Sequence, residues 1–155
     1  MTKYLLPVNY LPHRPPMILI DMVLEVTENS AVCESYVNTE GVLNNFLNEN
    51  GELPSYFTIE LIAQTVGVWS GYLAKLHNID IPPMGMVLGA RDLKYPKDHF
   101  DKGSVLKIQV KKIMDDGAIA SFDGEIISED KTVASGRVNL IRVTDDDLKR
   151  LFKRD

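Results

Sequence analysis

The chain contains only one cysteine, Cys33, among its 155 residues. A single thiol cannot form a disulfide within the chain and cannot supply the several thiolates of a cysteine-rich metal site. Histidine is also scarce: His13, His77 and His99 are the three present, and their separation in the sequence is not a ligand spacing. The sequence therefore predicts no metal site. Nothing in the cysteine content calls for an oxidising compartment, so we expect a cytoplasmic protein.

An excess of positive charge is lacking as well. The formal net charge is −5, with 25% charged residues. Binding to nucleic acid requires a concentrated basic surface, so the composition argues against a nucleic-acid partner. No stretch reaches the roughly 18 apolar residues of a membrane-spanning helix, and prolines interrupt the N-terminal segment where a signal peptide needs an unbroken apolar run. We therefore expect no insertion into a membrane.

Internal repeats, low-complexity runs and Gly/Ser linkers are absent from the sequence. A chain of 155 residues fits one domain, and a domain of this size buries on the order of 70% of the surface that its unfolded chain exposes. We predict a single domain covering residues 1–155.

Six segments have the composition of β-strands. Two of them, residues 15–26 and 31–37, are separated by the polar "TENS", which suits a hairpin. Four more follow later in the chain, at residues 85–95, 104–114, 118–128 and 132–143. In "LKIQVKKI" apolar and polar residues alternate, the pattern of an antiparallel sheet with one solvated face.

Between the two groups of strands, residues 53–72 ("LPSYFTIELIAQTVGVWSGY") have the pattern of a helix that is apolar on most sides. Such a helix must be covered on more than one side, and one sheet can do this only by curling around it. The final "TDDDLKRLFKRD" has Thr144 as N-cap, acidic residues in its first turn and basic residues at its end, which predicts a short helix. The fold class is thus α+β, with one long central helix wrapped by an antiparallel sheet of about six strands.

One face of the central helix is predicted to be polar. Glu60, Gln64, Gly67 and Gly71 are spaced i, i+4, i+7 and i+11, which places them on the same face. An ionised carboxylate in an apolar setting is costly unless it has a partner. Glu60 therefore either reaches solvent near the helix start or lines a pocket in which it can act as a general acid or base. The spacing alone leaves both interpretations open.

Several segments resemble a known family. "YLPHRPPMILIDMVLEV", "LPSYFTIELIAQTVGV" and "LGARDLKYPKDHFDKGSVLKIQV" resemble the hotdog-fold 3-hydroxyacyl-acyl-carrier-protein dehydratases of the FabA/FabZ type, with "LPHR-x-P" and "E-x-x-A-Q" as the specific matches. "GVLNNFLNENGELPSYFTIELIAQTVGVWSGY" and "GMVLGARDL" are similar to the ApeP branch, which is associated with aryl polyene biosynthesis. The resemblance implies a homodimer or heterodimer with acyl tunnels at its interface. It also implies a substrate carried on the phosphopantetheine of an acyl carrier protein, and no cofactor.

The same resemblance assigns site residues. Glu60 corresponds to the family's catalytic carboxylate, and Gln64 to its supporting glutamine. The family's oxyanion donor is a backbone N–H five residues before the carboxylate, which is Ser55 here, and we expect Ser55 and Tyr56 to bind the substrate. Dehydration requires one group to take a proton from the α-carbon, another to protonate the departing hydroxyl, and a donor to the thioester oxygen. A helix N-terminus suits the last of these roles because it favours negative charge.

One residue of the family pattern is missing. Usual members carry a catalytic histidine about fourteen residues before the carboxylate, and this count reaches Phe46 in "LNNFLNEN". No histidine lies between His13 and His77. His13, in the "LPHR" match, is the first candidate to replace it, and His99, in a loop, is the second. A residue donated by a partner subunit is the third.

Three functions remain open at this point. The chain is a 3-hydroxyacyl-acyl-carrier-protein dehydratase with an unusual partner for Glu60, a catalytically impaired subunit of a heterodimeric dehydratase, or an acyl thioesterase. The thioesterase is allowed because hotdog thioesterases also activate water with a helix carboxylate. The "LPHR-x-P" opening favours the dehydratase over the thioesterase.

Residues 14–17, "RPPM", contain two consecutive prolines, which predict a cis peptide bond between Pro15 and Pro16 that helps to place His13. Several basic residues are candidates for contact with the acidic surface or the phosphopantetheine phosphate of an acyl carrier protein. They are Arg14, Arg91, Lys94, Lys97 and Lys102.

Overall fold

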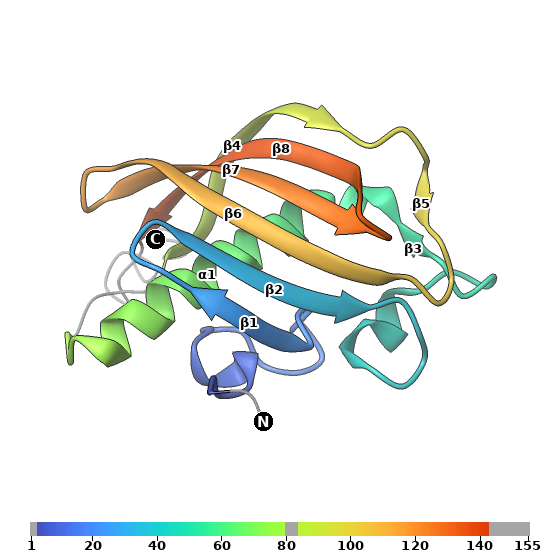
Figure 1. The fold of residues 1–155 in the computed structure, drawn as a ribbon, viewed down its shortest axis with the longest axis horizontal. Helices are drawn as coiled ribbons and strands as arrows, with labels where there is room; N and C mark the ends of the chain where they lie inside the picture. The colour runs from blue at the N-terminus through green and yellow to red at the C-terminus, as the bar shows by residue number, and fades with distance from the viewer. Residues whose placement is uncertain (1–2, 80–83, 143–155) are drawn as a thin grey trace, which may run out of the picture.

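Six strands form one antiparallel sheet in the order β1-β2-β6-β7-β8-β4 (Figure 1), in a computed structural model that describes residues 3–79 and 84–142. The strands are Met22–Val26 (β1), Ser30–Tyr36 (β2), Met84–Lys94 (β4), Val105–Asp115 (β6), Ile119–Ser128 (β7) and Lys131–Arg142 (β8). The predicted sheet is therefore confirmed. The helix predicted from Thr144 onward lies outside the described residues.

The long helix α1, Thr58–Leu76, contacts all six strands of this sheet, which curls around it (Figure 1). This is the wrapped-helix arrangement of the hotdog fold, as expected from the sequence. The helix begins later than its apolar pattern suggests, because Leu53–Pro54 form the short strand β3 and Ser55–Phe57 form the 3-10 turn η3. Strand β3 pairs with β5, His99–Phe100, and neither of these short strands was predicted. Two further 3-10 turns are η1, Pro7–Asn9, and η2, Val42–Phe46.

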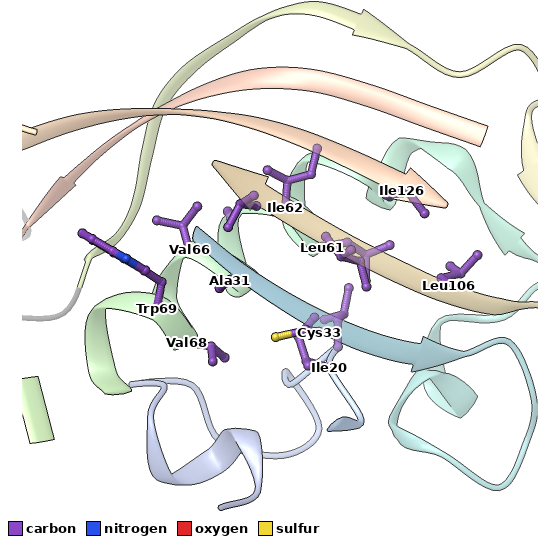
Figure 2. Packing of buried hydrophobic residues seen from close by; sticks show 14 of the residues in the cluster. Ile20, Ala31, Cys33, Leu61, Ile62, Val66, Val68, Trp69, Leu106 and Ile126 are labelled. Carbon is purple, nitrogen blue, oxygen red and sulfur yellow. The ribbon is translucent and has the colours of Figure 1, made fainter. Parts of the chain in front are cut away.

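The core lies between α1 and the concave face of the sheet. Figure 2 shows Leu61, Ile62 and Val66 of α1 among side chains from β2, β6 and β7. Along β6, Leu106, Ile108 and Val110 are buried while their neighbours are exposed or half-buried, so the predicted alternation is confirmed. The helix approaches the sheet so closely that a Cβ on Gly124 of β7 would lie 2.6 Å from the Ile62 side chain.

The first strand is shorter than the predicted segment 15–26. Asp21 still donates its N–H to the carbonyl of Glu34 on β2, but Leu19 bonds to side chains. The N–H of Leu19 donates to Gln64 Oε1 at 2.8 Å, and the carbonyl of Leu19 accepts from Ser35 Oγ at 2.6 Å. The peptide bond between Pro15 and Pro16 is cis, as predicted.

The N-terminal segment, residues 4–19, packs along the polar face of α1. A Cβ at Gly71 would collide with the carbonyl oxygen of Tyr10, so glycine is what permits this close approach. The ring of Tyr72 packs edge-on against Tyr4 and Tyr10, with ring centroids 5.2 and 5.7 Å apart. Gly71 and Tyr72 near the end of α1 thus hold the N-terminal segment that contains His13. Within the described residues, no helix has the length and apolar character needed to cross a membrane.

Candidate active site

Glu60 lies in the first turn of α1 and is the centre of the candidate site. Its Oε1 accepts a hydrogen bond of 3.0 Å from Gln64 Nε2. The Nε2 of His13 lies 3.6 Å from the same oxygen, which is too long for a hydrogen bond but within the range of an ion pair. Within the described residues, Oε2 accepts no hydrogen bond, and the side chain is 42% exposed. The structure thus brings together three of the predicted residues, around a carboxylate with one free oxygen.

Gln64 fastens the N-terminal segment to the helix beside this carboxylate. Its side chain is buried, and its Oε1 accepts from the N–H of Leu19. Its Nε2 donates both to the carbonyl of Met17 at 2.9 Å and to Glu60. Both amide hydrogens are therefore used, which fixes the orientation of the amide. Gln64 sets the position of Glu60 and of the segment that follows His13.

The His13 ring has an asymmetric environment. Its Nε2 faces Glu60, whereas its Nδ1 is buried and has no hydrogen-bond partner within the described residues. A proton on Nδ1 would be a buried donor without an acceptor, at a cost of about 1–3 kcal/mol. The favoured tautomer therefore carries its proton on Nε2, and that nitrogen then has no lone pair with which to take a proton from a substrate. In this geometry His13 presents an N–H toward the carboxylate.

Phe46 is the residue at which the family spacing predicts a histidine. Its ring packs edge-on against Phe57 with centroids 5.4 Å apart, and it is half-buried against the core. In the same segment, Asn48 Oδ1 accepts from the N–H groups of Asn50 and Glu52, which shapes the turn before β3. The contacts of Phe46 and Asn48 are structural and place no acid–base group beside Glu60.

Ser55 and Tyr56, the predicted substrate-binding residues, precede α1 in the turn η3. The N–H of Ser55 donates to the carbonyl of Asp98 at 2.9 Å, and its hydroxyl donates to the carbonyl of Lys97 at 2.6 Å. The first N–H groups of a helix have no hydrogen-bond partner inside the helix. The Tyr56 N–H is one of these, and it donates to no backbone carbonyl elsewhere in the described part of the chain. A substrate oxygen could bind the Tyr56 N–H directly, whereas the Ser55 N–H would first have to leave Asp98. Both assignments stay predictions.

The other two histidines do not join Glu60. His99 contacts Glu52, Asp98 and Asp101, and its hydrogen bond with Asp98 is the main cause that raises its pKa above the usual histidine value. His77 is the exposed residue that follows the last turn of α1. The structure therefore does not bring His99 into the Glu60 pair.

Side-chain ligand atoms of Glu52, His99 and Asp101 lie within 4.8 Å of one another, a spacing that could admit a cation. The ammonium of Lys97 already brings positive charge there, because it lies 2.7 Å from Asp101 Oδ1, and the His99 ring lies between the carboxylates. The expectation that the protein has no metal site stays a prediction.

Among the basic residues predicted to contact a carrier protein, only Arg14 adjoins the His13–Glu60 pair in the chain. Its Nη1 donates to the carbonyls of Leu11 and His13. Lys97 pairs with Asp101, and Arg91 and Lys94 lie on strand β4.

Comparisons with known proteins identify the family of the chain. Residues 6–153 match the family model ApeP-like, described as ApeP dehydratase. The 3-hydroxyacyl-[acyl-carrier-protein] dehydratase FabZ of Acinetobacter baumannii is 33% identical over 125 residues, covering 75% of this chain and 83% of that protein. The FabZ of Streptococcus agalactiae serotype V is 32% identical over 127 residues, covering 81% and 87%.

Among solved structures, a chain of the dehydratase heterocomplex ApeI:P from Xenorhabdus doucetiae is similar over almost its full length. The sequences are 38% identical, the match covers 98% of this chain and 100% of that one, and the TM-score is 0.93.

Proposed function

Since the chain belongs to the ApeP-like dehydratase family, we propose that it contributes Glu60 to an active site that dehydrates 3-hydroxyacyl thioesters carried on an acyl carrier protein. The observation that carries this proposal is the state of the carboxylate: Gln64 holds one oxygen, and the other is free and accessible. A carboxyl group fixed in this way can transfer a proton to or from a bound substrate.

The proposed reaction is a β-elimination. A base takes a proton from the α-carbon, the C–O bond at the β-carbon breaks, and a double bond forms between the two carbons. The protonated Glu60 carboxyl gives its proton to the departing hydroxyl, which leaves as water, and the proton held by the base then restores Glu60. Negative charge on the thioester oxygen is stabilised by the N–H of Tyr56 at the start of α1, while the Ser55 N–H stays bonded to the carbonyl of Asp98. The reaction needs no cofactor beyond the phosphopantetheine that carries the substrate.

We place the base on a second hotdog subunit. The family spacing counted back from Glu60 reaches Phe46 instead of a histidine, and His13 presents a nitrogen that favours carrying a proton. Both observations favour a base from elsewhere. The related ApeI:P structure is described as a dehydratase heterocomplex, which supports a mixed pair as the active form of this protein too. In that pair the other subunit supplies the base and this chain supplies the acid.

Strand β4 offers a surface for such a pair. It is an edge strand of the six-stranded sheet and is 11 residues long, and Leu88 on it is 55% exposed. A long edge strand has a row of unpaired backbone groups, which pairing with another subunit would satisfy. The Glu60 side chain is exposed to water in the single chain. A second subunit that covers it would exclude this water and so also favour the elimination.

A second candidate is a self-contained dehydratase in which His13 is the base. The 3.6 Å between His13 Nε2 and Glu60 Oε1 favours it, because the two groups are close enough to serve one substrate. It requires the imidazole proton to sit on the buried Nδ1.

The assay that tests these alternatives uses a 3-hydroxyacyl thioester of an acyl carrier protein and follows the acyl group by mass spectrometry. The chain is assayed alone and after co-purification with a second hotdog dehydratase subunit. We expect enoyl product from the mixed pair and none from the lone chain. Enoyl product from the lone chain would favour the His13 mechanism, and release of the free acid would identify a thioesterase.

A further inference from the structure

A clip of two chain segments, residues 52–55 and 97–101, holds the start of α1. Strands β3 and β5 pair within it, with Leu53 opposite Phe100 and Pro54 opposite His99. Ser55 then bonds through its N–H to the carbonyl of Asp98 and through its hydroxyl to that of Lys97. The donor segment at the helix N-terminus is therefore positioned by the clip as well as by the helix.

The side chain of His99 joins the two segments of the clip. Its Nε2 lies 3.1 Å from Glu52 Oε2 on the first segment and 3.2 Å from Asp101 Oδ1 on its own, and its Nδ1 lies 2.7 Å from Asp98 Oδ1. A neutral imidazole has one N–H and can donate on one side only, whereas an imidazolium donates from both nitrogens. Because carboxylates face both nitrogens, the protonated ring fits this site.

Glu52 is anchored in turn to the segment in which the family histidine is missing. Its Oε1 accepts from Asn48 Nδ2 at 3.2 Å, and its N–H donates to Asn48 Oδ1. The contacts thus run from Asn48 through Glu52 to His99 and Asp98, and the carbonyl of Asp98 accepts from the Ser55 N–H.

We propose that protonated His99 is a positioning residue that keeps the clip closed, with the Ser55 N–H held by Asp98, and so fixes the neighbouring Tyr56 N–H that faces the substrate. The role in catalysis rests on the proposed function, whereas the closure of the clip does not. His99 itself touches neither Glu60 nor the substrate in this account.

The charged groups around the ring determine the pH dependence. Three carboxylates, those of Glu52, Asp98 and Asp101, face it, and the positive groups nearby are Lys97, paired with Asp101, and Lys131, which lines the same hollow of about 170 Å³. The hydrogen bond with Asp98 and the charge of Glu52 raise the pKa of His99, and Lys97 opposes them. The clip is therefore fully closed below the usual histidine pKa and loosens as the pH rises through the raised value.

Hydrogen exchange of the Ser55 amide tests the clip without any assay of activity, because this N–H is bonded across it. At a pH where His99 is protonated, we expect His99→Gln to speed exchange at Ser55 by about 2- to 5-fold, the effect of losing a surface ion pair. His99→Arg keeps a positively charged side chain that can donate to carboxylates on both sides, so it should restore the protection of Ser55. In that variant the protection should not change with pH beyond the pH dependence of intrinsic exchange. His77→Gln, at an exposed histidine, is the matched control and should change nothing.

Equal exchange at Ser55 in the wild-type and His99→Gln proteins would overturn the proposal, as would wild-type protection that is constant with pH. A change in protection on adding EDTA would also overturn it, because a metal ion would then close the clip. In the mixed pair, His99→Gln should lower kcat by a similar factor with little change in KM. An unchanged kcat would remove the catalytic role and leave the clip, whereas absence of dehydration by the wild-type pair would bear on the proposed function alone.

Discussion

The imidazole Nε2 of His13 lies 3.6 Å from Oε1 of Glu60, on a segment that Gln64 ties to the helix through Met17 and Leu19. The "LPHR" and "E-x-x-A-Q" segments therefore lie side by side in the candidate site. What the pair does depends on whether His13 orients Glu60 or takes a proton itself, and two substitutions distinguish these roles.

If His13 orients the carboxylate, a side chain with an N–H in a similar place should largely replace it. We expect His13→Gln to keep dehydration by the mixed pair within about 3-fold of wild type and His13→Ala to lower kcat/KM by about 5-fold, since a partly exposed contact between an imidazole and a carboxylate contributes up to about 1 kcal/mol. A general base contributes about 10²- to 10⁴-fold. A loss of that size in both variants, with His77→Gln unaffected, would make His13 the base.

Removal of the Gln64 amide should destabilise the protein. Gln64→Leu keeps the volume but leaves the buried N–H of Leu19 without an acceptor, which costs about 1–3 kcal/mol in the free energy of unfolding. Urea denaturation measures this change. Gln109→Leu, at an exposed position of β6, is the control and should stay within about 0.5 kcal/mol of wild type. Equal stability of the two variants would show that the Gln64 bonds contribute little.

Gly71→Ala tests whether the N-terminal segment packs on α1 as described. In a helix interior this substitution ordinarily stabilises by up to about 1 kcal/mol. Here the new Cβ would collide with the carbonyl of Tyr10, so we expect a net loss of about 1–3 kcal/mol in the free energy of unfolding. The measurement is again urea denaturation. A more stable variant would mean that residue 10 does not lie against the helix.

The buried thiol of Cys33 should be unreactive in the native protein. Burial raises its pKa to about 12, against a weaker opposing effect of its hydrogen bond with Thr65. Because the thiolate is the reactive form, we expect no alkylation by iodoacetamide near pH 8 until denaturant is added. Above its ordinary pKa of 9.0 the unfolded chain loses a proton that the folded chain keeps, so Cys33 makes the free energy of unfolding fall as pH rises. Cys33→Ala should remove that part of the pH dependence, and rapid native alkylation would contradict the burial.

The strand and helix patterns were sufficient to predict the wrapped helix, because apolar periodicity reports directly which faces are buried. The sequence pattern predicted that Glu60, Gln64 and Gly71 share one face of the helix, but it did not predict which segment covers that face. Its covering is the N-terminal segment, held by bonds from the Gln64 side chain to the backbone of Met17 and Leu19. Backbone partners of this kind leave no residue-specific signal in a single sequence.

The clip was missed for a related reason. A two-residue pairing of Leu53–Pro54 with His99–Phe100 is too short to show a period, and Pro54 argues against a strand by composition. His99 was considered only as a replacement for the missing histidine. Its actual partners, Glu52 and Asp98, come from two segments that only the fold brings together.

The single-turnover rate of enoyl formation by a mixed pair that contains Glu60→Gln tests whether Glu60 supplies the acid in a site completed by a second subunit. The amide keeps the shape and the place beside Gln64 but cannot donate a carboxyl proton. We predict a rate about 10²- to 10⁴-fold below that of the wild-type pair, with Glu40→Gln, at an exposed carboxylate, unchanged. A Glu60→Gln pair that assembles and turns over at the wild-type rate would contradict the account and leave this chain a purely structural subunit.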